Sequence, residues 1–234
     1  MKIDLSSSNT ALTSIFRNPD QVITLDANSL IPPHRTRYAK RGFNFPLFKK
    51  VWLDPFYSAF PRLAIHEAVY DELIMPSVQS FVQSMINCHP PRLVIHKDSD
   101  LTPEEKVLRD TIESRIYPLT SYDPMLDNKD DRGEVKSLTY VAAKGLLYFA
   151  AHDYNAIQLI EKAEQWSTGL DNVQAVKMYE VIFYLYKTDI GDKESLRMLY
   201  KYQYYLTLNE RKNNPKWGQF IEKMDALYPS DIIK

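Results

Sequence analysis

Short apolar runs followed by acidic residues recur along this chain, and they constrain its fold more than any other feature. The runs 22–25, 63–65 and 146–149 each lead into an acid or an acid-bearing helical pattern, and 131–134 opens a further helix with acids. Such runs are typical of buried strands, and strands that alternate with helices favour a parallel sheet. Because ligands bind at the carboxyl ends of parallel strands, the acids are predicted to meet at one sheet edge.

The same reasoning assigns the other elements. Short β-rich runs predict strands at 21–25, 63–65, 92–95, 146–149 and 173–176. Helical spacing and capping residues predict helices at 66–75, 76–87, 103–115, 131–144, 155–166, 179–186, 192–208 and 214–228. Repeated prolines predict an irregular segment over 30–61. We expect an α/β domain with a central parallel sheet over 21–176, an N-terminal arm or short helix over 1–20 and a C-terminal helical extension over 177–234.

Composition excludes several kinds of site. Cys88 is the only cysteine, so neither an internal disulfide nor a cysteine-based zinc site can form, and a reducing, cytoplasmic location is expected. The sequence has no P-loop, dinucleotide-binding or nucleophile-elbow motif. Its apolar runs are far shorter than the roughly 20 residues of a membrane span, and we expect no membrane association. With a net charge of -1, nucleic-acid binding requires a local basic patch.

The acids that follow strands have two interpretations. Asp26 and Asp153 each follow an apolar run and precede a helical pattern. Each can bind a metal or cap the helix that follows. If Asp26 binds a metal, Asn28 or Ser29 is placed to orient it through a hydrogen bond.

The acids on helices have alternatives too. Asp131 and Glu134 lie three residues apart with Gly133 between them, which suits either a metal site or a capping box. Glu67 and Glu72 are five residues apart, so on one helix they point about 140° apart. Only one of these two glutamates can easily face a shared centre.

Three segments give the acids a specific order: VITLDANSLI, AIHEAVYDEL and DRGEVKSLTYVAAKGLLYFAAHDYNAI, which extend from residue 21 to about 160. In this order they resemble the PIN-domain family of metal-dependent nucleases. The resemblance implies a PIN-like sheet and a bound Mg²⁺ or Mn²⁺. It implies four catalytic carboxylates that bind the metal, Asp26, Glu72, Glu134 and Asp153, and Asp131 as a further metal ligand. The family's helix pattern favours Glu72 over Glu67. His152 departs from the family, which often has Thr or Ser there.

The resemblance implies hydrolysis of phosphodiester bonds in single-stranded RNA, with a metal-activated water as nucleophile. Such a substrate needs cations, and the segment 34–45 is basic with interleaved aromatics. Its predicted nucleic-acid-binding residues are Arg35, Arg37, Tyr38, Lys40 and Arg41. The alternative is a solvated loop whose aromatic residues anchor it to the core.

Other functions stay open from the sequence. A PIN-like scaffold could bind RNA or protein without catalysis, and an interaction module could use its acids only as helix caps. The tyrosines between 179 and 205 favour a helical core, with a docking surface for a protein partner or a second protomer as the alternative.

Overall fold

The computed structural model describes residues 2–35, 37–38 and 42–229, which form two units. The sheet unit comprises residues 22–31 and 62–177. The helical unit comprises the described residues of 1–21, 32–61 and 178–234.

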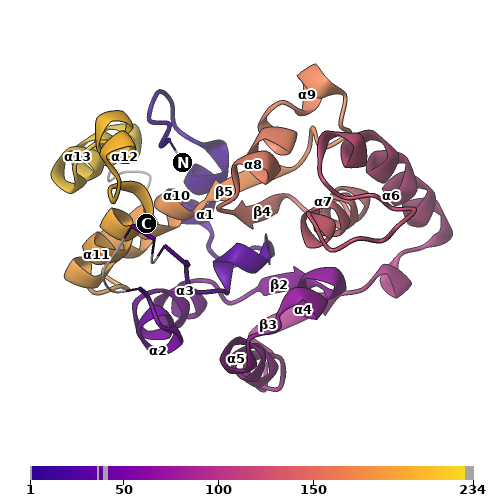
Figure 1. The fold of residues 1–234 in the computed structure, drawn as a ribbon, viewed down its shortest axis with the longest axis horizontal. Coiled ribbons are helices and arrows are strands. Elements are labelled where there is room, and N and C mark those ends of the chain that lie inside the picture. The colour runs from indigo at the N-terminus through magenta and orange to yellow at the C-terminus, as the bar shows by residue number, and fades with distance from the viewer. Residues whose placement is uncertain (1, 36, 39–41, 230–234) are drawn as a thin grey trace. The chain divides into compact units, whose positions relative to one another are not determined.

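Among the described residues, five parallel strands form one sheet in the order β3-β2-β1-β4-β5 (Figure 1). They are β1 Ile23–Leu25, β2 Leu63–His66, β3 Leu93–His96, β4 Tyr148–Ala151 and β5 Gln174–Lys177. Thr24 pairs with both Ala64 and Phe149, so β1 lies at the centre. Strands β1, β2 and β4 are buried along their whole length, as in sheets covered on both faces. The predicted α/β fold with a central parallel sheet is confirmed.

Helices flank this sheet and place the polar residues that follow its strands. They are α4 Glu67–Glu72, α5 Pro76–Ile86, α6 Pro103–Ile116, α7 Arg132–Ala143, α8 Tyr154–Glu161 and α9 Ala163–Trp166, with short helices η1 Ala27–Ser29, η3 Asp98–Asp100 and η4 Tyr117–Leu119. Thr102 caps α6 through a capping box, and Gly145 follows α7 with φ 64°. Helix α7 packs against α4, α6, β2 and β4.

The helical unit contains α1 Thr10–Arg17, α2 Phe45–Phe48, η2 Lys49–Leu53, α3 Asp54–Ala59, α10 Met178–Lys187, α11 Lys193–Tyr204, α12 Leu208–Asn213 and α13 Trp217–Leu227. Aromatic rings fill its core. Tyr200 stacks on Phe220 with ring centroids 4.5 Å apart, and Phe16 lies 4.9 Å from Tyr184. The C-terminal tyrosines therefore serve mainly as core residues. No helix among the described residues is both long and apolar enough to span a membrane.

Three predicted elements differ in the structure. The helix predicted over 155–166 is divided at Lys162 into α8 and α9. The segment 30–61 is helical over 45–59, because Pro46 and Pro55 each fall in the first turn of a helix, where a missing N–H breaks no hydrogen bond. The five-residue wide turn of η2 joins those helices. The helix predicted over 192–208 ends at Tyr204, and Thr207 begins α12 through a capping box with Glu210.

Candidate metal centre

The predicted carboxylates come from four parts of the sheet unit. Asp26 follows β1, Glu72 ends α4, Asp131 and Glu134 begin α7, and Asp153 follows β4. The charges of the other four all act on Glu134 and raise its pKa. We call these five residues the carboxylate cluster.

Asp26 is held by its own loop. One carboxylate oxygen accepts a hydrogen bond from the Ala27 N–H at 2.8 Å, and the other accepts one from the Asn28 amide at 3.0 Å. Asp26 is 5% exposed, and this burial raises its pKa to about 6 against those hydrogen bonds. The hydrogen bond expected from Asn28 is therefore present, while a metal-orienting role for it is still a prediction.

Glu72 reaches across to the start of α7. Its Oε1 accepts a hydrogen bond from the Gly133 N–H at 2.7 Å. A side chain at position 133 would collide with the Glu72 carboxylate, because a Cβ there would lie 2.7 Å from both of its oxygens. Glycine is thus required for this approach. Burial raises the pKa of Glu72, and the Asp26 charge adds to the effect.

Glu134 is the least satisfied member of the cluster. It is 7% exposed, and its Oε1 has no hydrogen-bond partner among the described residues. Burial, followed by repulsion from Asp26, Asp153, Asp131 and Glu72, raises its pKa to about 9. Ser137, one turn further along α7, also has a buried hydroxyl without a partner in the described part of the chain. The cluster therefore has unused acceptor capacity in a buried place.

Asp131 and Asp153 differ in their local roles. Asp153 caps α8, because its carboxylate accepts a hydrogen bond from the Asn155 N–H at 2.7 Å. Asp131 occupies the cap position of α7 in a left-handed conformation but makes no side-chain cap. Its carboxylate instead accepts a hydrogen bond from the Ser121 N–H at 2.8 Å. The capping-box alternative for Asp131 and Glu134 is therefore wrong, since the left-handed backbone turns the Asp131 side chain elsewhere.

The carboxylates of the cluster lie further apart than the ligands of a bound metal ion would. Among the described residues, only His66, Glu67 and Asp98 bring three ligand atoms within 4.8 Å of one another. Glu67 accepts a hydrogen bond from the Asp98 N–H at 2.8 Å, so it belongs to that group, whereas Glu72 belongs to the cluster. The His66 Nδ1 accepts from the Ala68 N–H, which leaves the proton on Nε2, facing Asp98 at 3.3 Å. That proton disfavours a metal at His66.

The described residues of the predicted RNA-binding set, Arg35, Arg37 and Tyr38, belong to the helical unit. Arg35 is engaged internally: it donates to the Tyr202 and Gln203 carbonyls at 2.6 Å and pairs with Glu210. Its guanidinium is therefore already paired within the helical unit, while RNA binding by Arg35 stays a prediction. Arg37 and Tyr38 are exposed. Lys40 and Arg41 lie outside the described residues.

Two features of this region were not predicted from the sequence. Gly133 permits the approach of Glu72, and the only signal for this was a glycine between two acids at a helix start. The second is the buried Ser137 hydroxyl, which has no hydrogen-bond partner among the described residues. The sequence indicated it only through its position three residues after Glu134.

Comparisons with known proteins add no assignment: no family model, no curated protein and no solved structure matches this chain.

Proposed function

We propose that the carboxylate cluster binds Mg²⁺ or Mn²⁺ and that the protein is a PIN-like endoribonuclease that hydrolyses phosphodiester bonds of single-stranded RNA. One observation carries the proposal: Glu134 is buried beside four other carboxylates, and one of its oxygens has no partner among the described residues. A buried acceptor without a donor costs about 1–3 kcal/mol, so a structural role alone explains it poorly.

A divalent cation suits this donor set. Carboxylate oxygens are the preferred ligands of Mg²⁺ and Mn²⁺, and a cation relieves the repulsion among neighbouring acids. Glu134, Glu72 and Asp26 would hold it, with Asp153 and Asp131 beside them. Since no three of the cluster's carboxylates lie within 4.8 Å, binding is expected to draw them together. The metal would activate a water and neutralise charge on the phosphodiester.

The chain's own residues give this binding a pH dependence. Because the pKa of Glu134 is raised to about 9, its carboxyl is protonated at neutral pH before a cation enters. Metal binding must release that proton, so affinity should rise between pH 6 and pH 9. The Asn28 amide fixes one oxygen of Asp26 and the Gly133 N–H fixes one of Glu72, which limits how these carboxylates turn.

A second function, a PIN-like scaffold that binds RNA or protein without catalysis, is favoured by one observation. Asp26 and Asp153 both act as helix caps, and the carboxylates stand apart. This alternative predicts neither metal binding nor cleavage.

Cleavage of a fluorescently labelled single-stranded RNA separates the two. The full-length protein is tested with MnCl₂, with MgCl₂ and with EDTA, beside Asp26→Asn purified in the same way. The proposal expects metal-dependent cleavage that Asp26→Asn lacks. Equal cleavage by both proteins indicates a contaminating nuclease, and binding without cleavage in every condition supports the scaffold.

A further inference from the structure

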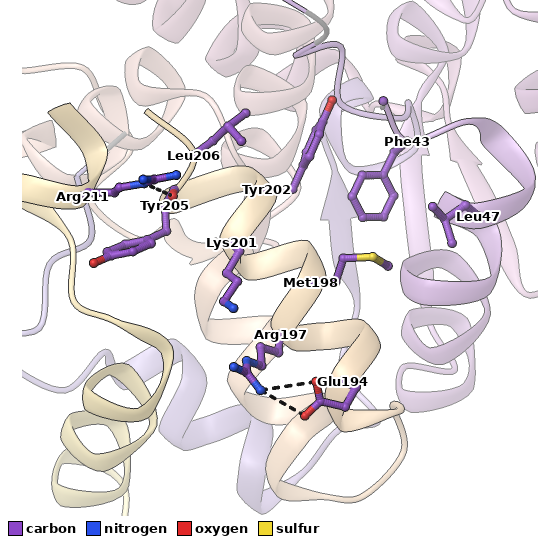
Figure 2. Close-up of a pocket in the computed structure, with 11 residues that line it drawn as sticks. Phe43, Leu47, Glu194, Arg197, Met198, Lys201, Tyr202, Tyr205, Leu206 and Arg211 are labelled. Atoms are coloured by element: carbon purple, nitrogen blue, oxygen red, sulfur yellow. Dashed lines mark hydrogen bonds and ion pairs between the residues drawn. The ribbon is translucent and has the colours of Figure 1, made fainter. Parts of the chain in front are cut away.

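The helical unit contains a cavity of about 830 Å³ that the carboxylate cluster does not touch. Its walls come from the segment before and within α2, from α11, from the turn that follows α11, and from α12 (Figure 2). Phe43 and Leu47 form one side, and Met198 and Tyr202 of α11 face them. The volume lies within the usual range of small-ligand sites.

The cavity combines an apolar wall with an excess of positive charge. Apolar and aromatic side chains dominate its lining, and its charged residues are Arg197, Lys201 and Arg211 against the single carboxylate of Glu194. The formal balance of these residues is therefore positive. An apolar ligand without charge would leave these cations unused, so the charge complementarity favours an anion with an apolar or aromatic body.

The cations retain free donors. Arg197 uses the terminal nitrogen Nη1 to pair with both carboxylate oxygens of Glu194, and its Nη2 makes no hydrogen bond among the described residues. Arg211 donates its Nε to the Tyr205 carbonyl at 3.3 Å and lies 5.9 Å from the Tyr205 ring, which leaves its terminal nitrogens available. Lys201 is exposed and makes no hydrogen bond or ion pair among the described residues.

The rings of the cavity favour a planar body for this anion. Phe43 packs edge-on against Tyr202 with centroids 4.8 Å apart, and Tyr205 forms another part of the wall. Aromatic walls with neighbouring Arg and Lys are the arrangement by which proteins hold unpaired bases and their phosphates. An aliphatic acid, with one carboxylate and no ring, would use less of this lining.

We propose that this cavity binds one nucleotide of single-stranded RNA, with the base against Phe43 and Tyr202 and the phosphate on Lys201, Arg197 and Arg211. The choice of a nucleotide over other aromatic anions rests on the proposed function, whereas the cavity and its charges do not.

Calorimetry with adenosine and uridine 5′-monophosphates tests this in EDTA, where no cleavage occurs. Lys201→Gln and Arg211→Gln should each weaken binding about tenfold, the loss expected for a hydrogen bond to a charged group. Lys212→Gln is the matched control, because Lys212 neighbours Arg211 in sequence but lines a different cavity, and it should bind like wild type. Met198→Trp fills the cavity and should abolish binding while the circular dichroism spectrum is kept.

Several results would overturn the inference. They are no nucleotide binding by wild type, equal binding by all variants, or equally tight binding of inorganic phosphate. Tighter binding of an aliphatic carboxylate or of an acidic peptide would name a different occupant and overturn it too. Glu134→Gln separates this proposal from the nuclease proposal, since it should weaken Mn²⁺ binding and keep nucleotide binding unchanged. Loss of nucleotide binding in the cavity variants with Mn²⁺ binding intact shows two independent sites.

Discussion

Two groups of buried and partly buried acids in the sheet unit differ in how their charge is compensated by neighbouring residues. In the first, which we call the paired network, Asp98 faces His66 at 3.3 Å and Arg109 at 3.6 Å, and Glu113 contacts both Arg109 and Lys136. In the carboxylate cluster, the strongest charges on Glu134 are four other carboxylates. The two groups have opposite electrostatics within one fold.

The pKa values follow this difference. Burial acts to raise the pKa of Asp98, but the hydrogen bond from His66 and the charge of Arg109 outweigh it and lower the pKa. Burial of Glu134 meets no such compensation, and its pKa rises to about 9. A buried acid beside cations is a structural feature. A buried acid among acids needs a further partner, which is why the cluster is the candidate site.

The largest effect is expected on the rate of RNA cleavage, when substitutions of the two glutamates of α4 are compared. Glu72→Gln should lower the rate of metal-dependent RNA cleavage by about 100-fold, the upper range for groups that orient or hold a metal. Glu67→Gln should leave the rate unchanged, because Glu67 contacts Asp98 of the paired network. Rates are measured with labelled single-stranded RNA in MnCl₂. Equal losses in both variants would remove the distinction between the two groups.

Removal of one cation from the paired network should destabilise the protein. Lys136→Met deprives Glu113 of a contact at 2.9 Å and should lower the free energy of unfolding by about 2 kcal/mol. Urea unfolding at pH 7 measures the loss. An unchanged stability would show that Arg109 alone satisfies Glu113.

The carboxylate cluster should respond to neutralisation in the opposite direction. A raised folded-state pKa stabilises the protein below the unfolded value of 4.5, and this contribution is lost as pH rises through about 9. Metal-free wild type should therefore lose stability between pH 5 and pH 9. Glu134→Gln should reduce this loss and be more stable than wild type by about 1–3 kcal/mol at pH 9. Thermal unfolding in EDTA across this range measures it, and a parallel pH profile in the two proteins would contradict the account.

The smallest effect is expected at Asp153, where two substitutions distinguish helix capping from metal binding. Asn also caps helices, so Asp153→Asn should keep the stability of the metal-free protein, while Asp153→Ala should lose about 1 kcal/mol. Both variants should bind Mn²⁺ more weakly than wild type. Thermal unfolding with and without MnCl₂ checks both statements. Mn²⁺ stabilisation of Asp153→Asn equal to that of wild type would leave Asp153 with its cap role alone.

The sequence predicted the sheet well because strands and their acids are local signals. The runs that become β1, β2 and β4 are apolar and end at polar residues, and a parallel sheet brings those ends to one edge. The choice between Glu67 and Glu72 was harder, since both lie on α4. It depends on Gly133, more than 60 residues away, whose missing side chain admits the Glu72 carboxylate.

Other features depend on contacts that no local pattern records. Arg35 looked available for phosphate, but carbonyls of Tyr202 and Gln203 and the Glu210 carboxylate engage it. The left-handed backbone of Asp131 removed a capping box that the spacing to Glu134 favoured. Prolines in 45–59 indicated a break, yet they lie in first turns, where helices tolerate them.

Calorimetric titration of Mn²⁺ at pH 7, in two buffers of different ionisation enthalpy, tests the central claim most directly. The account predicts binding to wild type with release of about one proton, supplied by Glu134, and weaker binding without that release in Glu134→Gln. Absence of binding to wild type, or the same affinity and proton release in Glu134→Gln, would contradict a metal site in the carboxylate cluster.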